Sequence, residues 1–395
     1  MIKEVIKFLL SLFFLPVWYL QKLIPKNSYI WIFGAWYGKK YSDNSRQLFE
    51  YVHSNHPEIQ CIWLTNERSI VRNLRQSGYK SYLRYSLPSI YYSLIAGINV
   101  VSSGKKDINQ YWISGSKTIQ LWHGNPLKKI CLDDKYSKVH SFYYKKIIKS
   151  FFPFQYEYNF DYVVSNAEIF TEIMGSAFGV KNDKVLLTGC PRNDLFYRKE
   201  DFLEKTLQSV NHTKAKRIIY LPTFRDRTDG LDLFEDYGFD VNNFKFFLEK
   251  HDLVFLYKGH FADRNSMSID MVDSRIINLN DIEDINFILK DADILITDYS
   301  GAYFDFLLTL KPIIFSAFDL KKYISNSREL YFNYNEIVAG PIAQNWDEVK
   351  FSIIELLRND NYKQLRVEMN NRFNLYHDNK NSERVYNELI QKLKY

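Results

Sequence analysis

Short apolar runs that alternate with helical patterns constrain the fold of this chain more than any other feature of the sequence. Runs of this length, bounded by polar or turn-forming residues, are typical of strands buried in a parallel sheet. The first set of predicted strands covers residues 29–33, 60–64, 98–101, 118–122, 161–164 and 184–188. After a polar stretch, 199–216, a second set follows at residues 217–221, 253–257, 275–279, 293–297 and 312–315. The pattern predicts two doubly wound α/β domains, in which ligands bind at the carboxyl ends of the strands.

Helical patterns lie between several of these strands and also close the chain. Residues 44–53, 167–178 and 302–310 have helical spacing, and the segment from Asp347 onward contains neither proline nor glycine. We place the two domains at residues 28–200 and 201–375. An N-terminal segment, 1–27, precedes them, and a C-terminal helix, 376–395, follows.

Composition excludes several classes of protein. Of the 395 residues, 46% are hydrophobic and 25% are charged, as in folded globular proteins. The net charge of +6 is too small to indicate a nucleic-acid-binding protein. Cys61, Cys131 and Cys190 form no CxxC pair, which excludes a disulfide scaffold and a structural zinc site. Aromatic residues reach 17%, which favours membrane interfaces or stacking on sugars but is also compatible with core packing.

The N-terminal segment carries an apolar run, residues 8–20, with lysines on both sides of it. A helix that spans a bilayer needs about 20 apolar residues, whereas this run is shorter and is interrupted by Pro16. A signal peptide, a single span and a buried helix are alternatives, but no small-residue cleavage site follows Leu20. We predict a retained helix in the membrane interface, on the cytoplasmic side because the few cysteines suit a reducing compartment.

The common nucleotide and hydrolase signatures are absent from the sequence. It contains no GxGxxG, no P-loop, no HExxH and no GxSxG. The triplet Asp291-Ala292-Asp293 has the form of the metal-binding DxD motif of one glycosyltransferase class, but we interpret it as a junction between a helix and a strand. No cluster of metal ligands is apparent in the sequence, so we predict no cofactor and no metal-binding residue.

Histidines follow predicted strands in both domains. His123 lies in Trp122-His123-Gly124 after one strand, and His260 lies in Lys258-Gly259-His260 after another. A histidine at a strand end can act as a general base near neutral pH, and Gly124 lets a substrate approach the backbone closely. A single histidine of this kind is more often structural, but its repetition in the second domain favours a functional pair.

Groups suited to binding phosphate follow other strands. Arg225 comes after the strand at 217–221, and its planar guanidinium can pair with phosphate oxygens. The motif Thr297-Asp298-Tyr299-Ser300-Gly301 opens one helix, and Asn381-Ser382-Glu383-Arg384 opens the last one. Backbone N–H groups at a helix N-terminus bind anions, although plain helix capping explains the same residues.

A basic stretch with interleaved aromatic residues runs from residue 128 to residue 154. Between Lys128 and Lys149 it holds seven lysines and two aspartates. A solvated helix face and contact with an anionic lipid surface are both compatible with this pattern.

Together these motifs resemble the CDP-glycerol glycerophosphotransferase family, the teichoic acid primases and polymerases of bacterial cell walls. The resemblance covers residues 28–390 and rests on the order and spacing of the motifs at 33–38, 43–45, 122–128, 222–226, 258–260, 292–300 and 382–384. Two positions depart from the family pattern. Asn125 stands where threonine is usual, and Gly301 stands where a second serine is usual.

The resemblance implies a GT-B fold and a peripheral membrane enzyme on the cytoplasmic side. Such an enzyme transfers a polyol phosphate from a CDP-activated donor to a hydroxyl of a lipid-linked saccharide or polymer and releases CMP. It implies an acceptor-binding N-terminal domain with His123 as the base, and a donor-binding C-terminal domain with His260 as a phosphate contact. The other implied substrate-binding residues are Gly124, Arg225, Lys258, Thr297, Asp298, Ser300, Gly301, Ser382 and Arg384. An anionic membrane surface is an implied partner, and nucleic acid is not.

The motifs do not distinguish glycerol from ribitol phosphate, priming from polymerisation, or teichoic acid from capsule. The alternative enzyme class is a GT-B glycosyltransferase that moves a sugar, which would break a sugar C–O bond rather than a bond to phosphorus. The non-enzymatic alternative is a membrane-bound scaffold with an inactive cleft, which the intact histidines and arginines disfavour.

Overall fold

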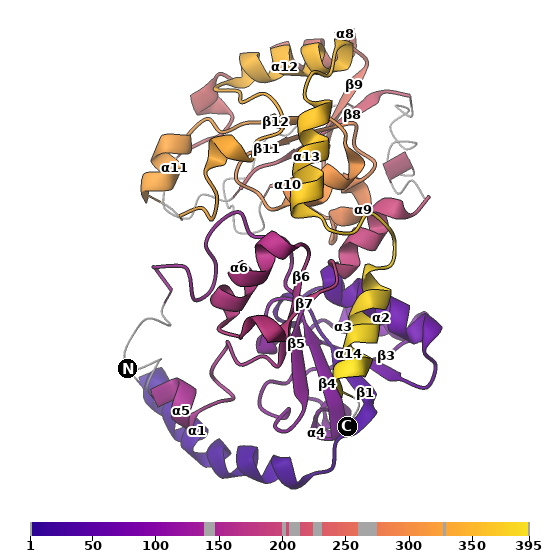
Figure 1. Ribbon diagram of the computed structural model, residues 1–395, viewed down its shortest axis with the longest axis vertical. Coiled ribbons are helices and arrows are strands. Elements are labelled where there is room, and N and C mark those ends of the chain that lie inside the picture. The colour runs from indigo at the N-terminus through magenta and orange to yellow at the C-terminus, as the bar shows by residue number, and fades with distance from the viewer. Residues whose placement is uncertain are drawn as a thin grey trace. The chain divides into compact units, whose positions relative to one another are not determined.

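The computed structural model describes residues 2–137, 147–199, 203–204, 214–223, 231–259, 275–326 and 329–393. The chain divides into two compact units, each built on one parallel sheet (Figure 1). Unit 1 comprises Met1–His123, Cys131–Asp194 and Asp378–Tyr395, and unit 2 comprises Gly124–Ile130 and Leu195–His377. The predicted class, α/β with two parallel-sheet domains, is confirmed.

Unit 1 contains a seven-stranded sheet in the order β3-β2-β1-β4-β5-β6-β7, in which neighbouring strands are parallel. Trp31, Ile32 and Phe33 of the interior strand β1 are fully buried, as in parallel sheets that are covered on both faces. The strands are β1 (Asn27–Phe33), β2 (Gln60–Thr65), β3 (Lys80–Leu83), β4 (Ala96–Val101), β5 (Lys117–Gln120), β6 (Tyr162–Ser165) and β7 (Val185–Leu187).

The last helix of the chain belongs to unit 1. It packs against α2 and adds Val385 and Leu389 to the core around Trp31 and Trp63. The helices of unit 1 are α1 (Ile2–Leu20), α2 (Asp43–Asn55), α3 (Arg68–Gln76), α4 (Leu87–Ile95), α5 (Lys149–Phe151), α6 (Glu168–Phe178) and α14 (Asn381–Leu393). Short 3-10 turns accompany them, including η2 (Trp36–Gly38) and η3 (Lys105–Asp107).

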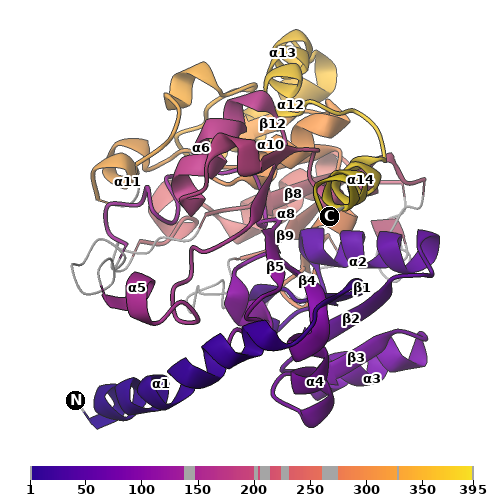
Figure 2. The same cartoon turned by 60° about the horizontal axis from the view of Figure 1, so that its bottom comes forward.

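The N-terminal part of helix α1 extends away from the rest of unit 1 (Figure 2), and its C-terminal half packs against that unit. The rings of Phe14 and Trp18 pack against Phe154, with centroids 5.9 and 5.6 Å apart. Phe13 and Leu20 are 76% and 61% exposed, so a second face of α1 is apolar and open to solvent. Within the described ranges, no helix combines the length and the hydropathy that a membrane span needs.

Unit 2 contains a five-stranded parallel sheet in the order β10-β9-β8-β11-β12. Its core stacks Phe234 on Trp346, with ring centroids 5.2 Å apart, beneath the buried Tyr220 and Phe255. The strands are β8 (Lys216–Leu221), β9 (Leu253–Tyr257), β10 (Ile276–Asn278), β11 (Ile294–Thr297) and β12 (Ile313–Phe315). The helices are α8 (Val241–Lys250), α9 (Asn286–Leu289), α10 (Ala302–Phe306), α11 (Leu320–Asn326), α12 (Trp346–Arg358) and α13 (Lys363–Phe373).

The structure differs from the sequence-based prediction at a few element ends. Strand β3 was not predicted, and the strand expected at 118–122 ends at Gln120 because Trp122 adopts a left-handed backbone conformation, with φ 56°. The helix expected at 302–310 is the short α10 followed by a 3-10 turn, and Leu310 ends it with φ 55°.

Candidate functional site

His123 lies on the loop that leaves the carboxyl end of β5 in unit 1. Its ring is held between two indoles, with centroid distances of 4.9 Å to Trp36 and 3.8 Å to Trp122. The positive φ angles of Trp36 and Trp122 turn both loops so that these rings meet around the imidazole. Backbone strain of this kind costs free energy and is often found at functional sites.

A backbone carbonyl fixes the tautomer of this imidazole. Nδ1 of His123 lies 3.1 Å from the carbonyl oxygen of Ser102, which can only accept a hydrogen bond. Nδ1 therefore carries the proton in the neutral ring, and Nε2 is the basic nitrogen. Among the described residues, no protein group is hydrogen-bonded to Nε2.

Burial keeps this imidazole neutral. Desolvation is the largest effect and lowers the pKa of His123, and the positive charge of Arg192 acts in the same direction. The negative charge of Asp43 and the bond to Ser102 oppose the shift without reversing it. A neutral imidazole with an open Nε2 can accept a proton from a hydroxyl at ordinary pH.

Two buried side chains hold the His123 loop in place. The Asn44 amide donates to the Trp122 carbonyl at 2.8 Å and accepts from the Arg192 backbone N–H at 2.9 Å. The Arg192 guanidinium donates to the His123 carbonyl at 2.5 Å and pairs with Asp43 at 3.1 Å. The side chains of Arg192 and Asp43 are each only 6% exposed, so this is a buried ion pair that also holds the backbone of His123.

Asp107 organises the loop that carries the Ser102 carbonyl. Its carboxylate accepts backbone N–H bonds from Ser102 at 2.9 Å, from Ser103 at 2.7 Å and from Tyr37 at 2.6 Å. Burial raises its pKa to about 6, although these hydrogen bonds act to lower it. Asp107 thus links the Trp36–Gly38 turn to the partner of His123.

In unit 2, the expected phosphate-binding turn follows β11. The Thr297 hydroxyl donates to the Leu221 carbonyl at 2.8 Å. The Asp298 carboxylate accepts from the Thr223 backbone N–H at 2.9 Å and from the Tyr299 N–H at 2.5 Å. Both side chains are buried, so they bring the loop after β8 next to the loop after β11.

The two departures from the family pattern, Asn125 and Gly301, lie in contact with each other in unit 2. A Cβ atom added to Gly301 would lie 2.6 Å from the Asn125 carbonyl oxygen. A serine at this position would therefore collide with backbone, which explains the glycine. Gly124 precedes this contact with φ 143°, a conformation that favours glycine. The neighbouring Ser300 hydroxyl accepts from the Ala302 N–H at 3.3 Å, as a helix cap does.

The remaining predicted site residues with described positions make internal contacts. The ammonium group of Lys258 donates to three backbone carbonyls, those of Leu279, Asn280 and Ile282. His260 and Arg225 lie outside the described residues.

Ser382 and Arg384 secure the start of α14 in unit 1. The Asp194 carboxylate accepts from the Ser382 hydroxyl at 2.6 Å and from its backbone N–H at 2.9 Å. Arg384 donates to both oxygens of Asp378, at 3.0 and 2.7 Å, and to the Thr188 carbonyl at 3.0 Å. Among the described residues of unit 1, neither side chain is hydrogen-bonded to His123, and both hold the helix terminus.

Sequence reasoning did not assign roles to Asp43, Asn44, Asp107 and Arg192. Asp43 and Asn44 belong to a motif that the resemblance includes, but the pattern alone does not say what they contact. Arg192 follows Gly189-Cys190-Pro191, residue types that are typical of a turn and indicate no binding role by themselves. Buried polar residues in loops after strands are the signal that could have singled them out.

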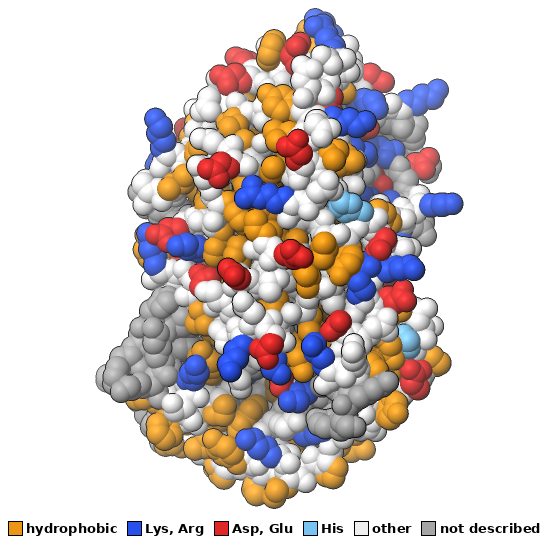
Figure 3. Space-filling view, viewed as in Figure 1, with side chains coloured by type: hydrophobic (Ala, Val, Ile, Leu, Met, Phe, Trp, Pro, Cys, Tyr) orange, Lys and Arg blue, Asp and Glu red, His pale blue; other side chains and the backbone are white. Residues whose placement is uncertain are grey.

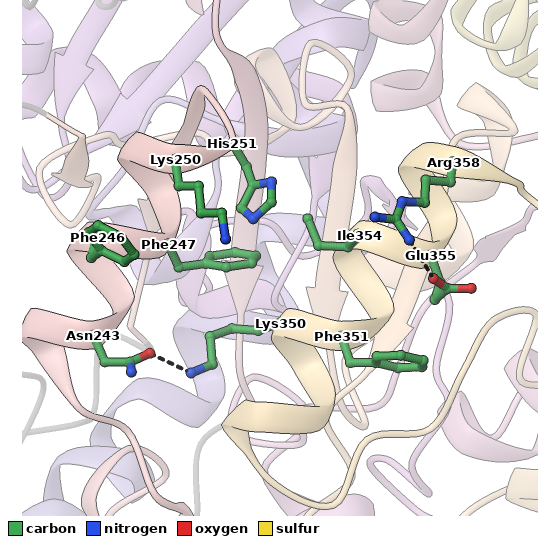
Figure 4. Close-up of a pocket in the computed structure, with 10 residues that line it drawn as sticks. All are labelled: Asn243, Phe246, Phe247, Lys250, His251, Lys350, Phe351, Ile354, Glu355 and Arg358. Carbon is green, nitrogen blue, oxygen red and sulfur yellow. Dashed lines mark hydrogen bonds and ion pairs between the residues drawn. The ribbon is translucent and has the colours of Figure 1, made fainter.

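A hollow lies on the surface of unit 2 between α8 and α12 (Figure 4). It measures about 430 Å³ and is lined by apolar and basic side chains, including Phe247, Lys250, Lys350 and Ile354. None of the motif residues lines it, so it is not part of the candidate site.

Comparison with known proteins agrees with the motifs. The family described as CDP-glycerol:poly(glycerophosphate) glycerophosphotransferase matches residues 17–391. A teichoic acid glycerol-phosphate transferase of Staphylococcus aureus is 32% identical over 356 residues, which cover 87% of this chain and 88% of that protein. A teichoic acid glycerol-phosphate primase of Bacillus subtilis is 31% identical over 280 residues, covering 69% of this chain and 67% of that one.

A solved structure shares the fold. The wall teichoic acid polymerase TagF superposes with a TM-score of 0.76 at 23% identity, with all of both chains covered. Since the sequence match extends over almost the whole length, from residue 17 to residue 391, the chain belongs to the CDP-glycerol:poly(glycerophosphate) glycerophosphotransferase family.

Proposed function

We propose that this protein transfers glycerol phosphate from CDP-glycerol to a hydroxyl of a lipid-linked acceptor in teichoic acid synthesis, with His123 as the general base. The observation that supports the assignment most directly is the neutral imidazole whose Nδ1–H is bound to the Ser102 carbonyl, so that Nε2 is the basic nitrogen. Family membership supplies the reaction class, and this geometry supplies the residue.

The chemistry requires one proton transfer and one displacement at phosphorus. Nε2 of His123 takes the proton of the acceptor hydroxyl as its oxygen attacks the phosphorus that bears glycerol. A new P–O bond forms to the acceptor, the P–O bond to CMP breaks, and CMP carries away the bonding electron pair. In-line positioning and neutralisation of phosphate charge supply most of the rate enhancement in such transfers.

We assign donor binding to unit 2 and acceptor binding to unit 1. For the donor, we propose contacts from Ser300, from the backbone of Gly301 and Gly124, and from Arg225 and His260. Thr297 and Asp298 support this role by holding the loops after β8 and β11 together. Lys258, Ser382 and Arg384 hold backbone and helix ends, so we propose that they position the substrate-binding loops rather than contact phosphate.

We further propose that the enzyme is a peripheral membrane protein on the cytoplasmic face, with α1 as its anchor. Hydrophobic side chains gather at the surface over α1 (Figure 3), where Leu12, Phe13 and Leu20 are exposed, as is Leu23 in the 3-10 turn that follows the helix. A helix with one docked face and one open apolar face suits the interface of a bilayer, where its lipid-linked acceptor resides.

Incubation of the full chain with CDP-glycerol and a panel of lipid-linked acceptors tests the proposed reaction. We expect release of CMP together with a mass gain of one or more glycerol phosphates on the acceptor. If UDP-sugars, and not CDP-glycerol, gave a modified acceptor, the enzyme would be a glycosyltransferase and the proposal would be wrong.

A further inference from the structure

A small cavity opens in unit 1 beside the loop that carries His123. It measures about 80 Å³, and its lining includes Tyr37, Ser103, Lys105, Gln120 and Trp122. At roughly 15 Å³ for each water position, it has room for several waters or one compact polar group. Trp122 lines the cavity, and its ring centroid lies 3.8 Å from that of His123, so the cavity adjoins a residue that packs against His123.

One residue that lines this cavity, Gln120, carries a buried amide donor without an acceptor among the described residues. Gln120 is fully buried, and its Oε1 accepts the Trp122 N–H at 3.0 Å, which fixes the orientation of the amide. Its Nε2 is buried and has no hydrogen-bond partner among the described residues, and the same holds for the Ser103 hydroxyl. Buried amide groups are normally paired, so this one calls for an oxygen atom from a ligand.

The charge of the lining also favours an anion. Lys105 is 5% exposed and donates to the Tyr156 carbonyl at 3.2 Å, and burial lowers its pKa to about 8. Lys106 is paired with Glu157. The three charged side chains of the lining, Lys105, Lys106 and Glu157, therefore carry one net positive charge when both lysines are protonated. Two ammonium groups and an unpaired amide donor suit the oxygens of a phosphate better than a neutral sugar.

We propose that this cavity binds the phosphodiester that precedes the attacking hydroxyl in an acceptor already carrying a polyol phosphate. The proposal rests on the proposed function, because it places this phosphate in the acceptor of the same reaction. An acceptor that ends in a polyol phosphate has an anionic diester near its attacking hydroxyl, whereas a bare lipid-linked disaccharide offers only sugar hydroxyls there. The enzyme therefore elongates acceptors that have already received a first polyol phosphate.

Cys131 provides a test that needs neither donor nor turnover. It lines the cavity and is partly exposed, whereas Cys61 and Cys190 are only 3% and 5% exposed. The rate at which iodoacetamide alkylates Cys131 in the full chain is measured by mass spectrometry. The measurement is made in the presence of a short-lipid disaccharide acceptor that either bears or lacks one glycerol phosphate. At ten times its Kd, the phosphate-bearing acceptor should slow alkylation of Cys131 about tenfold, and the acceptor that lacks phosphate should not.

Cys131→Ser is the control and should take up no label under the same conditions. Equal protection by both acceptors, or protection by neither, would overturn the proposal. Release of CMP from CDP-glycerol is measured separately, so a failure of the proposed function is distinguished from a failure of this cavity assignment.

Gln120→Glu tests directly whether the side-chain amide of Gln120 donates a hydrogen bond to the bound phosphate. The variant keeps an oxygen for the Trp122 N–H but replaces the amide donor with a second oxygen, which repels phosphate. We expect KM for the phosphate-bearing acceptor to rise at least about tenfold, with little change for the neutral acceptor and with unchanged CDP-glycerol binding.

Gln76→Glu, at an exposed position of unit 1, is the matched control. An unchanged KM for the phosphate-bearing acceptor, or equal increases for both acceptors, would overturn the proposal. If Gln120→Glu does not fold, the protection of Cys131 in the wild-type protein still decides the question.

Discussion

At the scale of single residues, one backbone carbonyl decides which nitrogen of His123 can act as the base. The Ser102 carbonyl accepts from Nδ1, and the loop that carries it is tied to the buried carboxylate of Asp107. The His123 carbonyl in turn accepts a hydrogen bond from Arg192, so both the ring and the backbone of His123 are held in place. Positioning of this kind removes conformational freedom before the substrate arrives.

Replacement of His123 by alanine should lower kcat at least ~10²-fold, the usual contribution of a general base. CDP-glycerol affinity, measured by calorimetry, should stay unchanged because we assign the donor to unit 2. The pKa of His123 is lowered from 6.5, so wild-type kcat should fall only as the pH drops below that value and protonates Nε2.

His251→Ala, at the surface hollow of unit 2, is the control and should keep normal turnover. Near-normal kcat in His123→Ala would contradict the assignment of the base. A loss of wild-type activity that begins above pH 6.5 would contradict the lowered pKa.

Replacement of Arg192 by methionine should lower the free energy of unfolding by about 3 kcal/mol or more, because Asp43 is left buried without its cation. Unfolding in urea measures the loss. The matched control is Arg358→Met, whose ion pair with Glu355 joins side chains that are 74% and 52% exposed. That change should lower the free energy of unfolding by under about 1 kcal/mol. If both variants lost the same free energy of unfolding, the buried Arg192–Asp43 pair would stabilise the protein no more than an exposed pair does.

At the scale of elements, the segment Gly124–Ile130 is held within unit 2 by an isolated antiparallel bridge between Lys128 and Leu330. The Lys129 N–H donates to the Glu329 carbonyl at 2.8 Å, and the Tyr331 N–H donates to the Leu127 carbonyl at 2.9 Å. These bonds fix the segment so that the Asn125 carbonyl lies against the start of α10. The glycine at position 301 is therefore a consequence of how closely two elements approach.

Gly301→Ser restores the residue that the family pattern favours, yet it should destabilise this protein by about 1–3 kcal/mol, as overpacking does. The new Cβ would lie 2.6 Å from a carbonyl oxygen that belongs to backbone and cannot rotate away. Thermal or urea unfolding checks this. Ala302→Ser, at a partly exposed position next to it, should cost no more than about 0.5 kcal/mol, and a serine at 301 that is as stable as wild type would refute the close contact.

The sequence was sufficient for the strands whose residues are apolar throughout, and insufficient where an element depends on distant contacts. Strand β9 was predicted with its bounds, since all five of its residues are buried. Strand β3 was missed because it is a short edge strand that begins with an exposed lysine. The breaks between α12, α13 and α14 occur without proline or glycine, so no local signal marks them.

The candidate site also contains residues that the sequence can single out and residues that it cannot. His123 could be singled out because its position after a predicted strand is visible in the local sequence. Asn44 and Arg192 meet across 148 residues of sequence, and their roles depend on the sheet order that brings α2 and the loop after β7 to β5. A single sequence without aligned relatives cannot show such pairs.

At the scale of the whole molecule, the motif around His123 is also a crossing of the chain between its two units. His123 is the last residue of unit 1 before the crossing, and Gly124 is the first of unit 2. One short motif thus places the proposed base, His123, in one unit and a glycine with positive φ, Gly124, in the other. Helix α1, the proposed anchor, belongs wholly to unit 1.

The anchor can be tested without removing α1, whose Phe14 and Trp18 cover apolar surface that truncation would expose. The double variant Phe13→Glu, Leu20→Glu changes only outward-facing side chains, 76% and 61% exposed. Burial of each such side chain contributes ~1.5–3 kcal/mol, so co-sedimentation with vesicles that contain anionic lipid should weaken at least about tenfold.

The matched control, Phe246→Glu with Phe351→Glu, alters two side chains of unit 2 that are 66% and 68% exposed. Undiminished binding by the α1 variant, or an equal loss in the control, would place the membrane contact elsewhere on the molecule.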